Sequence, residues 1–254
     1  MKSKKAKKPK KKKFGLIGKN ISYSFSKKYF TEKFEKINFT HYSYKNFDIA
    51  SIEELPTILG NIKNLKGLNV TIPYKEAVLP YLTTLSKNAE IIGAVNVIKV
   101  SKNGDLKGYN SDFYGFKKAL SPLLKKQHKR ALILGTGGAS KAVAYALRKM
   151  HIEYDFVSRN PTEYQFSYEE LTQELFSEYQ IIINTTPVGT SPNTDDCPPL
   201  DYSLFTENHI AFDLIYNPEE TKFLRLAKEN GATTKNGYDM LVFQAEKAWE
   251  IWNK

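Results

Sequence analysis

The chain has 254 residues, enough for one large or two modest domains, and 41% of them are hydrophobic, so a core can be buried. The sequence lacks a run of about 18 apolar residues and an apolar N-terminal segment, so we expect neither a membrane span nor a secretory signal. The net charge of +11 is concentrated in residues 1–13, which contain nine lysines and no acid. The rest carries 29 basic against 27 acidic residues, so the body is nearly neutral.

The lysine-rich segment, residues 1–13, predicts a disordered tail, because like charges repel each other. Such a tail could contact RNA, DNA or an anionic membrane electrostatically. It lacks the aromatic and arginine residues that stack on bases, which favours a solvated extension without a dedicated role.

Cysteine and histidine usage points to a reducing compartment and away from metal binding. Cys197 is the only cysteine, so an internal disulfide is excluded and a cytoplasmic location fits. The four histidines are scattered without the spacing of a zinc site, and we expect no metal.

The first half alternates short strands and helices. Order is expected from Phe14, with a strand to Gly18, and aromatic residues at helical spacing follow in residues 29–37. We predict strands over 39–47 and 65–72, and helices over 51–62, 74–82 and on to about residue 92.

Residues 95–110 form the clearest hairpin of the sequence. Asn103-Gly104 is a favoured two-residue turn between alternating apolar residues. Pairing about that turn places Asn96 opposite Ser111, and Asp112 at the same end of the hairpin.

From Ala131 onward, buried strands and helices alternate with short turns. Strands are expected over 131–134, 154–157, 181–183 and 210–214, and helices over 140–150 and from Asn217-Pro218 to Gly231. This order predicts a doubly wound parallel sheet. The last helix carries Trp249 and Trp252 on an apolar face, and we expect it to pack back on the first half.

A glycine-rich turn joins the first of these strands to its helix. Gly135 permits a tight turn, Gly137 lets a pyrophosphate approach the backbone, and the helix N-terminus supplies N–H groups. The next strand ends in Ser158-Arg159-Asn160, without the acid that an NAD site uses for the ribose. Arg159 can pair with a 2′-phosphate, which favours NADP, although nearby Glu163 would repel one if it pointed inward.

Several ordered motifs together resemble the shikimate dehydrogenase family over nearly the whole chain from Phe14 to Trp252. The motifs are Asn69-Val-Thr-Ile-Pro-Tyr-Lys75, Ile92-Gly-Ala-Val-Asn96, Asn110-Ser-Asp112, Gly135-Thr-Gly-Gly-Ala139, Ile183-Asn-Thr-Thr-Pro-Val-Gly189, Asp213-Leu-Ile-Tyr-Asn-Pro218, Asn236-Gly-Tyr-Asp-Met-Leu241 and Gln244. The resemblance implies reversible reduction of 3-dehydroshikimate to shikimate with NADPH, in aromatic amino-acid biosynthesis.

The resemblance also implies roles for individual residues. Lys75 would be the catalytic acid/base, paired with Asp112. The substrate-binding set would be Ser24, Ser26, Thr71, Asn96, Asp112, Tyr216 and Gln244. The cofactor-binding set would be Gly135, Thr136, Gly137, Gly138, Ala139, Ser158, Arg159, Leu214 and Gly237.

The sequence therefore predicts an α/β protein with a substrate-binding domain over 14–112, completed by 236–254, and a Rossmann-like NADP domain over 113–235. The active site is expected where these domains meet. An NAD-dependent quinate/shikimate dehydrogenase and a non-catalytic ligand-sensing protein remain alternatives on the same fold. A monomer and a homodimer are both compatible with the sequence.

Overall fold

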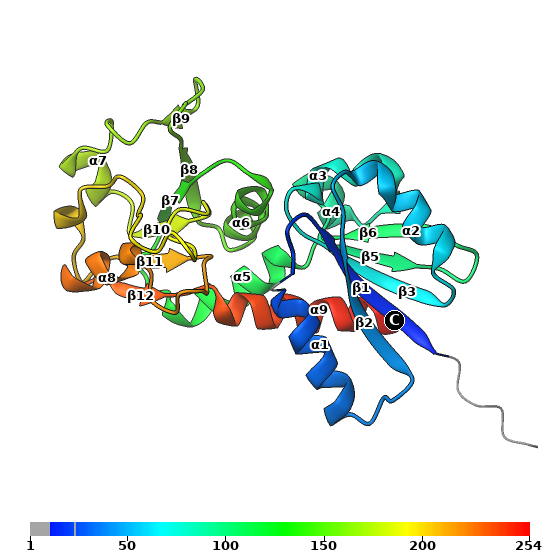
Figure 1. Ribbon diagram of the computed structural model, residues 1–254. Helices are drawn as coiled ribbons and strands as arrows, with labels where there is room; N and C mark the ends of the chain where they lie inside the picture. The colour runs from blue at the N-terminus through cyan, green and yellow to red at the C-terminus, as the bar shows by residue number, and fades with distance from the viewer. Residues whose placement is uncertain (1–10, 23) are drawn as a thin grey trace, which may run out of the picture. The chain divides into compact units, whose positions relative to one another are not determined.

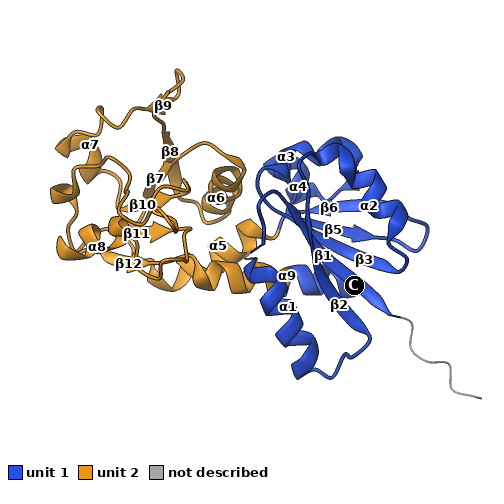
Figure 2. Cartoon of the chain, in the orientation of Figure 1, with its two compact units in different colours: residues 1–110, 248–254 blue, residues 111–247 orange. Residues whose placement is uncertain are grey.

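The computed structural model describes residues 11–22 and 24–254, and the chain divides into two compact units (Figure 2). Unit 1 comprises the chain up to Asn110 together with Ala248–Lys254, and unit 2 comprises Ser111–Lys247. Most of the predicted lysine tail, residues 1–10, and Tyr23 lie outside the described residues.

Unit 1 is built on a mixed six-stranded sheet in the order β2-β1-β3-β5-β6-β4 (Figure 1). β1 lies parallel to both β2 and β3, whereas β5 is antiparallel to β3 and to β6. The strands are β1 Lys12–Gly18, β2 Tyr42–Asp48, β3 Leu65–Val70, β4 Thr84–Leu85, β5 Val97–Val100 and β6 Leu106–Tyr109. The helices are α1 Phe25–Lys36, η1 Ile52–Glu54, α2 Leu55–Asn61, α3 Tyr74–Ala77, η2 Leu79–Tyr81 and α4 Lys87–Ile92.

An aromatic cluster ties the end of the chain to the start of unit 1. The ring of Trp252 packs against Phe14, with ring centroids 4.9 Å apart, and against Phe30 at 5.2 Å. Its Nε1 donates to the carbonyl of Ile98 at 3.0 Å. A Cβ at Gly67 would lie 2.1 Å from Nε1 of Trp252, so only glycine allows this approach. The last helix, α9 Tyr238–Asn253, thus packs back on the first half as predicted.

Unit 2 contains an all-parallel six-stranded sheet in the order β12-β11-β10-β7-β8-β9, the Rossmann-like arrangement that the sequence predicted (Figure 1). The strands are β7 Arg130–Leu134, β8 Glu153–Val157, β9 Gln165–Phe166, β10 Ile181–Asn184, β11 Ile210–Asp213 and β12 Thr233–Lys235. The strand order reverses between β7 and β10, and ligands of such sheets bind at the carboxyl ends of the strands at this point.

Helices cover both faces of this sheet because alternate residues of a strand point to opposite sides. Ile133 packs with Phe116 of α5 and Val143 of α6, whereas Leu132 packs with the residues around α7 and α8. The helices are α5 Asp112–Leu120, η3 Ser121–Leu123, α6 Gly138–Lys149, α7 Gln173–Ser177, η4 Tyr202–Leu204 and α8 Lys222–Glu229.

The hairpin register differs by one residue from the prediction. Val97 pairs with Tyr109, and Asn96 donates its N–H to the Tyr109 carbonyl, so Ser111 is not its partner. The connection is longer than a two-residue turn because the Ser101 side chain accepts from the N–H groups of Asn103 and Asp105.

Two element starts also differ from the prediction. β1 begins at Lys12, two residues earlier than Phe14, because Lys12 and Lys13 pair with Tyr42 and Ser43 of β2. α8 begins at Lys222 rather than after Asn217-Pro218, since its N-cap is Thr221, whose hydroxyl accepts from the N–H of Leu224. In the described part of the chain, none of the helices has the length and apolar character that crossing a bilayer requires.

Candidate functional site

The glycine turn after β7 has the geometry of a phosphate-binding loop. Gly135 has φ +99°, a conformation that favours glycine, and a Cβ there would lie 2.8 Å from Cγ2 of Thr186. Gly137 precedes α6, and apart from its own atoms and those of its two chain neighbours, none of the described atoms lies within 4 Å of the place where its Cβ would be. No side chain caps α6, and Ser140 turns inward to donate to the Gly137 carbonyl at 2.6 Å. The open space and the first-turn N–H groups fit a pyrophosphate.

The end of β8 carries a cation and no acid. Arg159 is exposed, and its charge lowers the pKa of Tyr168, although burial raises that pKa by more. Ser158 uses its hydroxyl locally, accepting from the N–H of Asn160 at 3.2 Å. Glu163 is exposed in the same connection. This chemistry suits a 2′-phosphate better than a bare ribose.

Leu214 and Gly237, which belong to the predicted cofactor-binding set, lie against each other in unit 2. A Cβ at Gly237 would lie 2.1 Å from the Leu214 carbonyl oxygen, and the Gly237 N–H donates to the Ile215 carbonyl at 2.9 Å. Tyr216 follows and is 37% exposed, and burial raises its pKa.

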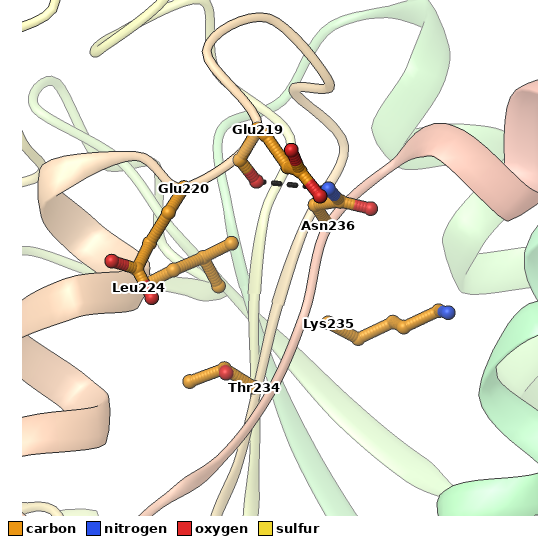
Figure 3. Close-up of a pocket in the computed structure, with 6 residues that line it drawn as sticks. All are labelled: Glu219, Glu220, Leu224, Thr234, Lys235 and Asn236. Atoms are coloured by element: carbon orange, nitrogen blue, oxygen red, sulfur yellow. Dashed lines mark hydrogen bonds between the residues drawn. The ribbon is translucent and has the colours of Figure 1, made fainter.

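A shallow pocket of about 480 Å³ lies beside this segment (Figure 3). Glu220 in its wall accepts from Lys228 at 3.0 Å, and the Asn236 side chain donates to the Glu219 carbonyl at 2.8 Å. Two carboxylates beside the single cation Lys235 make this pocket unsuitable for a phosphate. Its contacts instead fasten the segment before α8 to the segment before α9.

A polar group in unit 1 surrounds the carboxyl end of β3. The Lys75 carbonyl accepts from the N–H of Val95 at 2.8 Å, which fixes the start of α3 beside Asn96. The Asn96 carbonyl accepts from the N–H of Val70, the residue before Thr71. Asn96 is 3% exposed, whereas Lys75 is half-buried.

Ser24 and Ser26, two residues of the predicted substrate-binding set, differ in their surroundings. Ser24 caps α1, accepting from the Lys27 N–H at 3.4 Å. Ser26, two residues further on, is buried, and its hydroxyl hydrogen-bonds Tyr44. Burial raises the pKa of Tyr44, and the hydrogen bond from Ser26 lowers it by less. Tyr44 in turn donates to Oδ1 of Asn69 at 2.7 Å.

Two further predicted site residues of unit 2, Asp112 and Gln244, lie on α5 and α9. Asp112 is the first residue of α5 and is buried, and the positive end of the helix dipole favours its carboxylate. Gln244 is buried and accepts from the Ser111 hydroxyl at 3.3 Å. Lys75 belongs to unit 1 and Asp112 to unit 2.

Some buried polar residues received no role from sequence reasoning. Tyr44 and Asn69 form the hydrogen-bonded line between Ser26 and the Asn96 carbonyl. Asn184 and Asp213 are fully buried at the ends of β10 and β11. For Asn184 and Asp213, the sequence did offer a signal: each is a polar residue that ends an otherwise apolar strand. In the ranges that the structure describes, no group of three or more metal-ligating side chains occurs.

The fold and the glycine turn define a class of protein: a dinucleotide-binding α/β protein with a second unit that carries a group of polar residues. The family model of the shikimate dehydrogenase substrate-binding domain matches residues 16–98. An NADP(+) shikimate dehydrogenase of Clostridium botulinum is 37% identical over 94% of this chain and 95% of its own. The chain therefore belongs to the shikimate dehydrogenase family.

Solved structures agree with this membership. The shikimate 5-dehydrogenase of Thermus thermophilus, in complex with NADP(H) and shikimate, is 33% identical with a TM-score of 0.84, over 95% of this chain and 93% of that one. The quinate dehydrogenase of Corynebacterium glutamicum, in complex with NAD, is 26% identical with a TM-score of 0.84, over 96% and 94%.

Proposed function

We propose that this chain catalyses the reversible NADPH-dependent reduction of 3-dehydroshikimate to shikimate. The observation that carries the proposal is Lys75, held at the start of α3 by the Val95 N–H beside Thr71 and Asn96, in a chain that matches a family member over 94% of its length. NADP is the cofactor named for the family members that match over this length.

The substrate is a polyhydroxylated carboxylic acid, which needs several fixed hydrogen-bonding groups. We propose that Ser24 and Ser26 bind its carboxylate, the first from a helix cap and the second beside Tyr44. Its hydroxyls would be held by Thr71, Asn96, Asp112 and Gln244, with Tyr216 close by. Asn96, Asp112 and Gln244 supply amide and carboxylate groups, which can donate to or accept from substrate hydroxyls.

Lys75 would be the proton donor in the reducing direction. The carbonyl oxygen of the substrate develops negative charge during reduction, and an ammonium group stabilises that charge and supplies a proton. The Asp112 carboxylate would orient the ammonium and accept from a substrate hydroxyl. In the oxidising direction the lysine takes the proton back.

The cofactor, when bound, supplies the hydride. Residues 135–139 would hold its pyrophosphate, and Ser158 and Arg159 its 2′-phosphate. Leu214 and Gly237 would border the nicotinamide. We further propose that the substrate-binding domain covers 14–112 with 236–254, the cofactor domain covers 113–235, and the enzyme acts in the cytoplasm, which the free thiol of Cys197 supports.

Loss of NADPH absorbance on adding 3-dehydroshikimate to the purified protein tests the activity directly. Turnover is expected, and its absence, with substrate binding still detectable by calorimetry, would favour a ligand-sensing protein. The quinate dehydrogenase likeness makes a second comparison informative: NADP and NAD, each with shikimate and with quinate. The highest kcat/KM is expected for shikimate with NADP, and an NAD–quinate preference would contradict the proposal.

A further inference from the structure

A buried carboxyl group without a proposed catalytic role lies at the carboxyl end of β11, in the sheet of unit 2. Asp213 ends β11 and is fully buried. One of its oxygens accepts from Nδ2 of Asn184 at 3.1 Å and from the Ile215 N–H at 3.0 Å. The other accepts from the Thr221 hydroxyl at 2.6 Å. Among the described residues Asp213 has no ion-pair partner, so three neutral donors replace water around it.

Further hydrogen bonds connect Asn184 to the glycine turn after β7. The other side of Asn184 accepts from the N–H of Thr186 at 3.0 Å and from its hydroxyl at 2.6 Å. Thr185 donates both its N–H, at 3.0 Å, and its hydroxyl, at 2.7 Å, to the Leu134 carbonyl. Thr186 also faces Gly135, since a Cβ there would meet its methyl group. The loop after β10 is therefore fixed against the glycine turn.

The same carboxylate also leads toward Leu214 and Gly237. Its bond to the Ile215 N–H orients the peptide that follows Leu214, and the Ile215 carbonyl then accepts from Gly237. The Thr221 hydroxyl donates to the other oxygen of Asp213 and so fixes the end of the 214–221 loop. Asp213 thus joins the two connections at the carboxyl ends of β10 and β11, the edge where such sheets bind ligands.

The two oxygens of the Asp213 side chain together accept from three donors. An asparagine offers one accepting oxygen and one donating amide, so it cannot accept on both sides. Burying a carboxyl group is costly, so its presence where apolar packing would suffice suggests a specific task.

We propose that Asp213 is a positioning residue for the nicotinamide cofactor: it holds the loops over 184–189 and 214–221 in the arrangement that receives NADPH. The proposal rests on the cofactor named in the proposed function. It assigns no contact between Asp213 and the substrate or the reacting atoms.

The experiment measures NADPH affinity in the absence of substrate, by cofactor fluorescence, with the full chain. In Asp213→Asn the dissociation constant should rise about tenfold or more, because one side of the carboxylate no longer accepts. With saturating NADPH, kcat should fall much less than kcat/KM for NADPH.

A second pair of variants decides the matter if Asp213→Asn fails to fold. Thr221→Val removes the donor to Asp213 and should weaken NADPH binding, whereas Thr221→Ser keeps the hydroxyl and should restore it. Thr221 also caps α8, so the matched control is Thr172→Val, which removes only the cap of α7. That control should leave NADPH affinity within twofold of wild type.

Tyr179→Phe controls for general destabilisation. Tyr179 is buried before β10, at the opposite edge of the sheet, and donates to Asp155 at 2.6 Å. If it loses stability as Asp213→Asn does and weakens NADPH binding equally, positioning by Asp213 is wrong. The proposal is also overturned if Asp213→Asn, or Thr221→Val in its place, binds NADPH within twofold of wild type. If the wild type binds NADPH but does not reduce 3-dehydroshikimate, while the variants behave as expected, the proposed function fails and the positioning role stands.

Discussion

Lys75 is a half-buried lysine whose backbone is fixed by Val95, so its side chain starts from a defined point. Replacing it by alanine removes the proposed proton donor and leaves the backbone contact. We expect Lys75→Ala to lower kcat by roughly 10²–10⁴-fold with a smaller change in KM, because the ammonium interaction strengthens in the transition state. Lys87→Ala, at the exposed start of α4, is the matched control and should retain full turnover. A Lys75→Ala enzyme with wild-type kcat would contradict the assignment.

Arg159 is expected to determine the choice between the two nicotinamide cofactors. A charge-assisted contact with a phosphate contributes about 1.5–3 kcal/mol, so Arg159→Ala should raise the KM for NADPH by roughly 10–100-fold. The KM for NADH should change little, since NADH lacks the 2′-phosphate. Glu163→Gln removes the neighbouring negative charge and should lower the KM for NADPH slightly. Equal losses with both cofactors would show that Arg159 does not bind the 2′-phosphate.

Gly135 and Gly104 allow the free-energy cost of backbone strain to be distinguished from the cost of steric crowding. Both have positive φ, +99° and +94°, but a Cβ at Gly104 meets nothing within 4 Å, whereas one at Gly135 meets Thr186. Gly104→Ala should cost about 1–3 kcal/mol of unfolding free energy from conformation alone. Gly135→Ala should cost more and should also weaken NADPH binding. Denaturant unfolding and fluorescence titration of both variants measure the difference, and equal costs would mean that the loop at Thr186 yields.

Asp213, at the carboxyl end of β11, should make the free energy of unfolding depend on pH. Burial raises the pKa of Asp213 to about 7, against the lowering effect of Thr221, Ile215 and Asn184. The folded chain thus keeps a proton that the unfolded chain loses near pH 4, and the stabilisation present below about pH 4 is lost as pH rises to about 7. Nearby Tyr202 has its pKa raised by burial, so it does not titrate in this window.

Asp213→Asn does not titrate, so its unfolding free energy relative to wild type should increase between about pH 4 and pH 7, by at most about 4 kcal/mol. Urea unfolding of both proteins at the two ends of this window measures the change. Parallel pH curves for the two proteins would show that the Asp213 pKa is not raised.

Local sequence patterns were sufficient to predict most helices and strands. They were not sufficient to predict contacts between residues that are distant in the sequence. The strand, glycine turn and helix over 130–149 were predicted because adjacent residues determine them. The hairpin register was wrong because the side chain of Ser101 organises a longer loop. The Asn184–Asp213–Thr221 contacts could not be predicted, since they join residues brought together only by the strand order.

At the scale of the whole chain, charge separates the N-terminal lysines from a nearly neutral body. Deleting residues 1–10 should leave kcat and KM within about twofold of the full chain, because no proposed site residue lies there. Binding to a polyanion at low salt should fall on deletion and should weaken steeply with added salt in the full chain. Loss of turnover in the shortened chain, measured in the NADPH assay, would assign the lysine segment a role in catalysis.

The aromatic cluster of unit 1 has a consequence for the synthesis of the chain. Phe14 and Phe30 are synthesised before unit 2, but Trp252, which packs on both, is synthesised after it. Ser111–Lys247 forms one uninterrupted stretch and is complete before that tryptophan emerges. Unit 1 is therefore begun before unit 2 and completed after it, and a ribosome that stalls before Trp252 would hold a chain whose first core is still open.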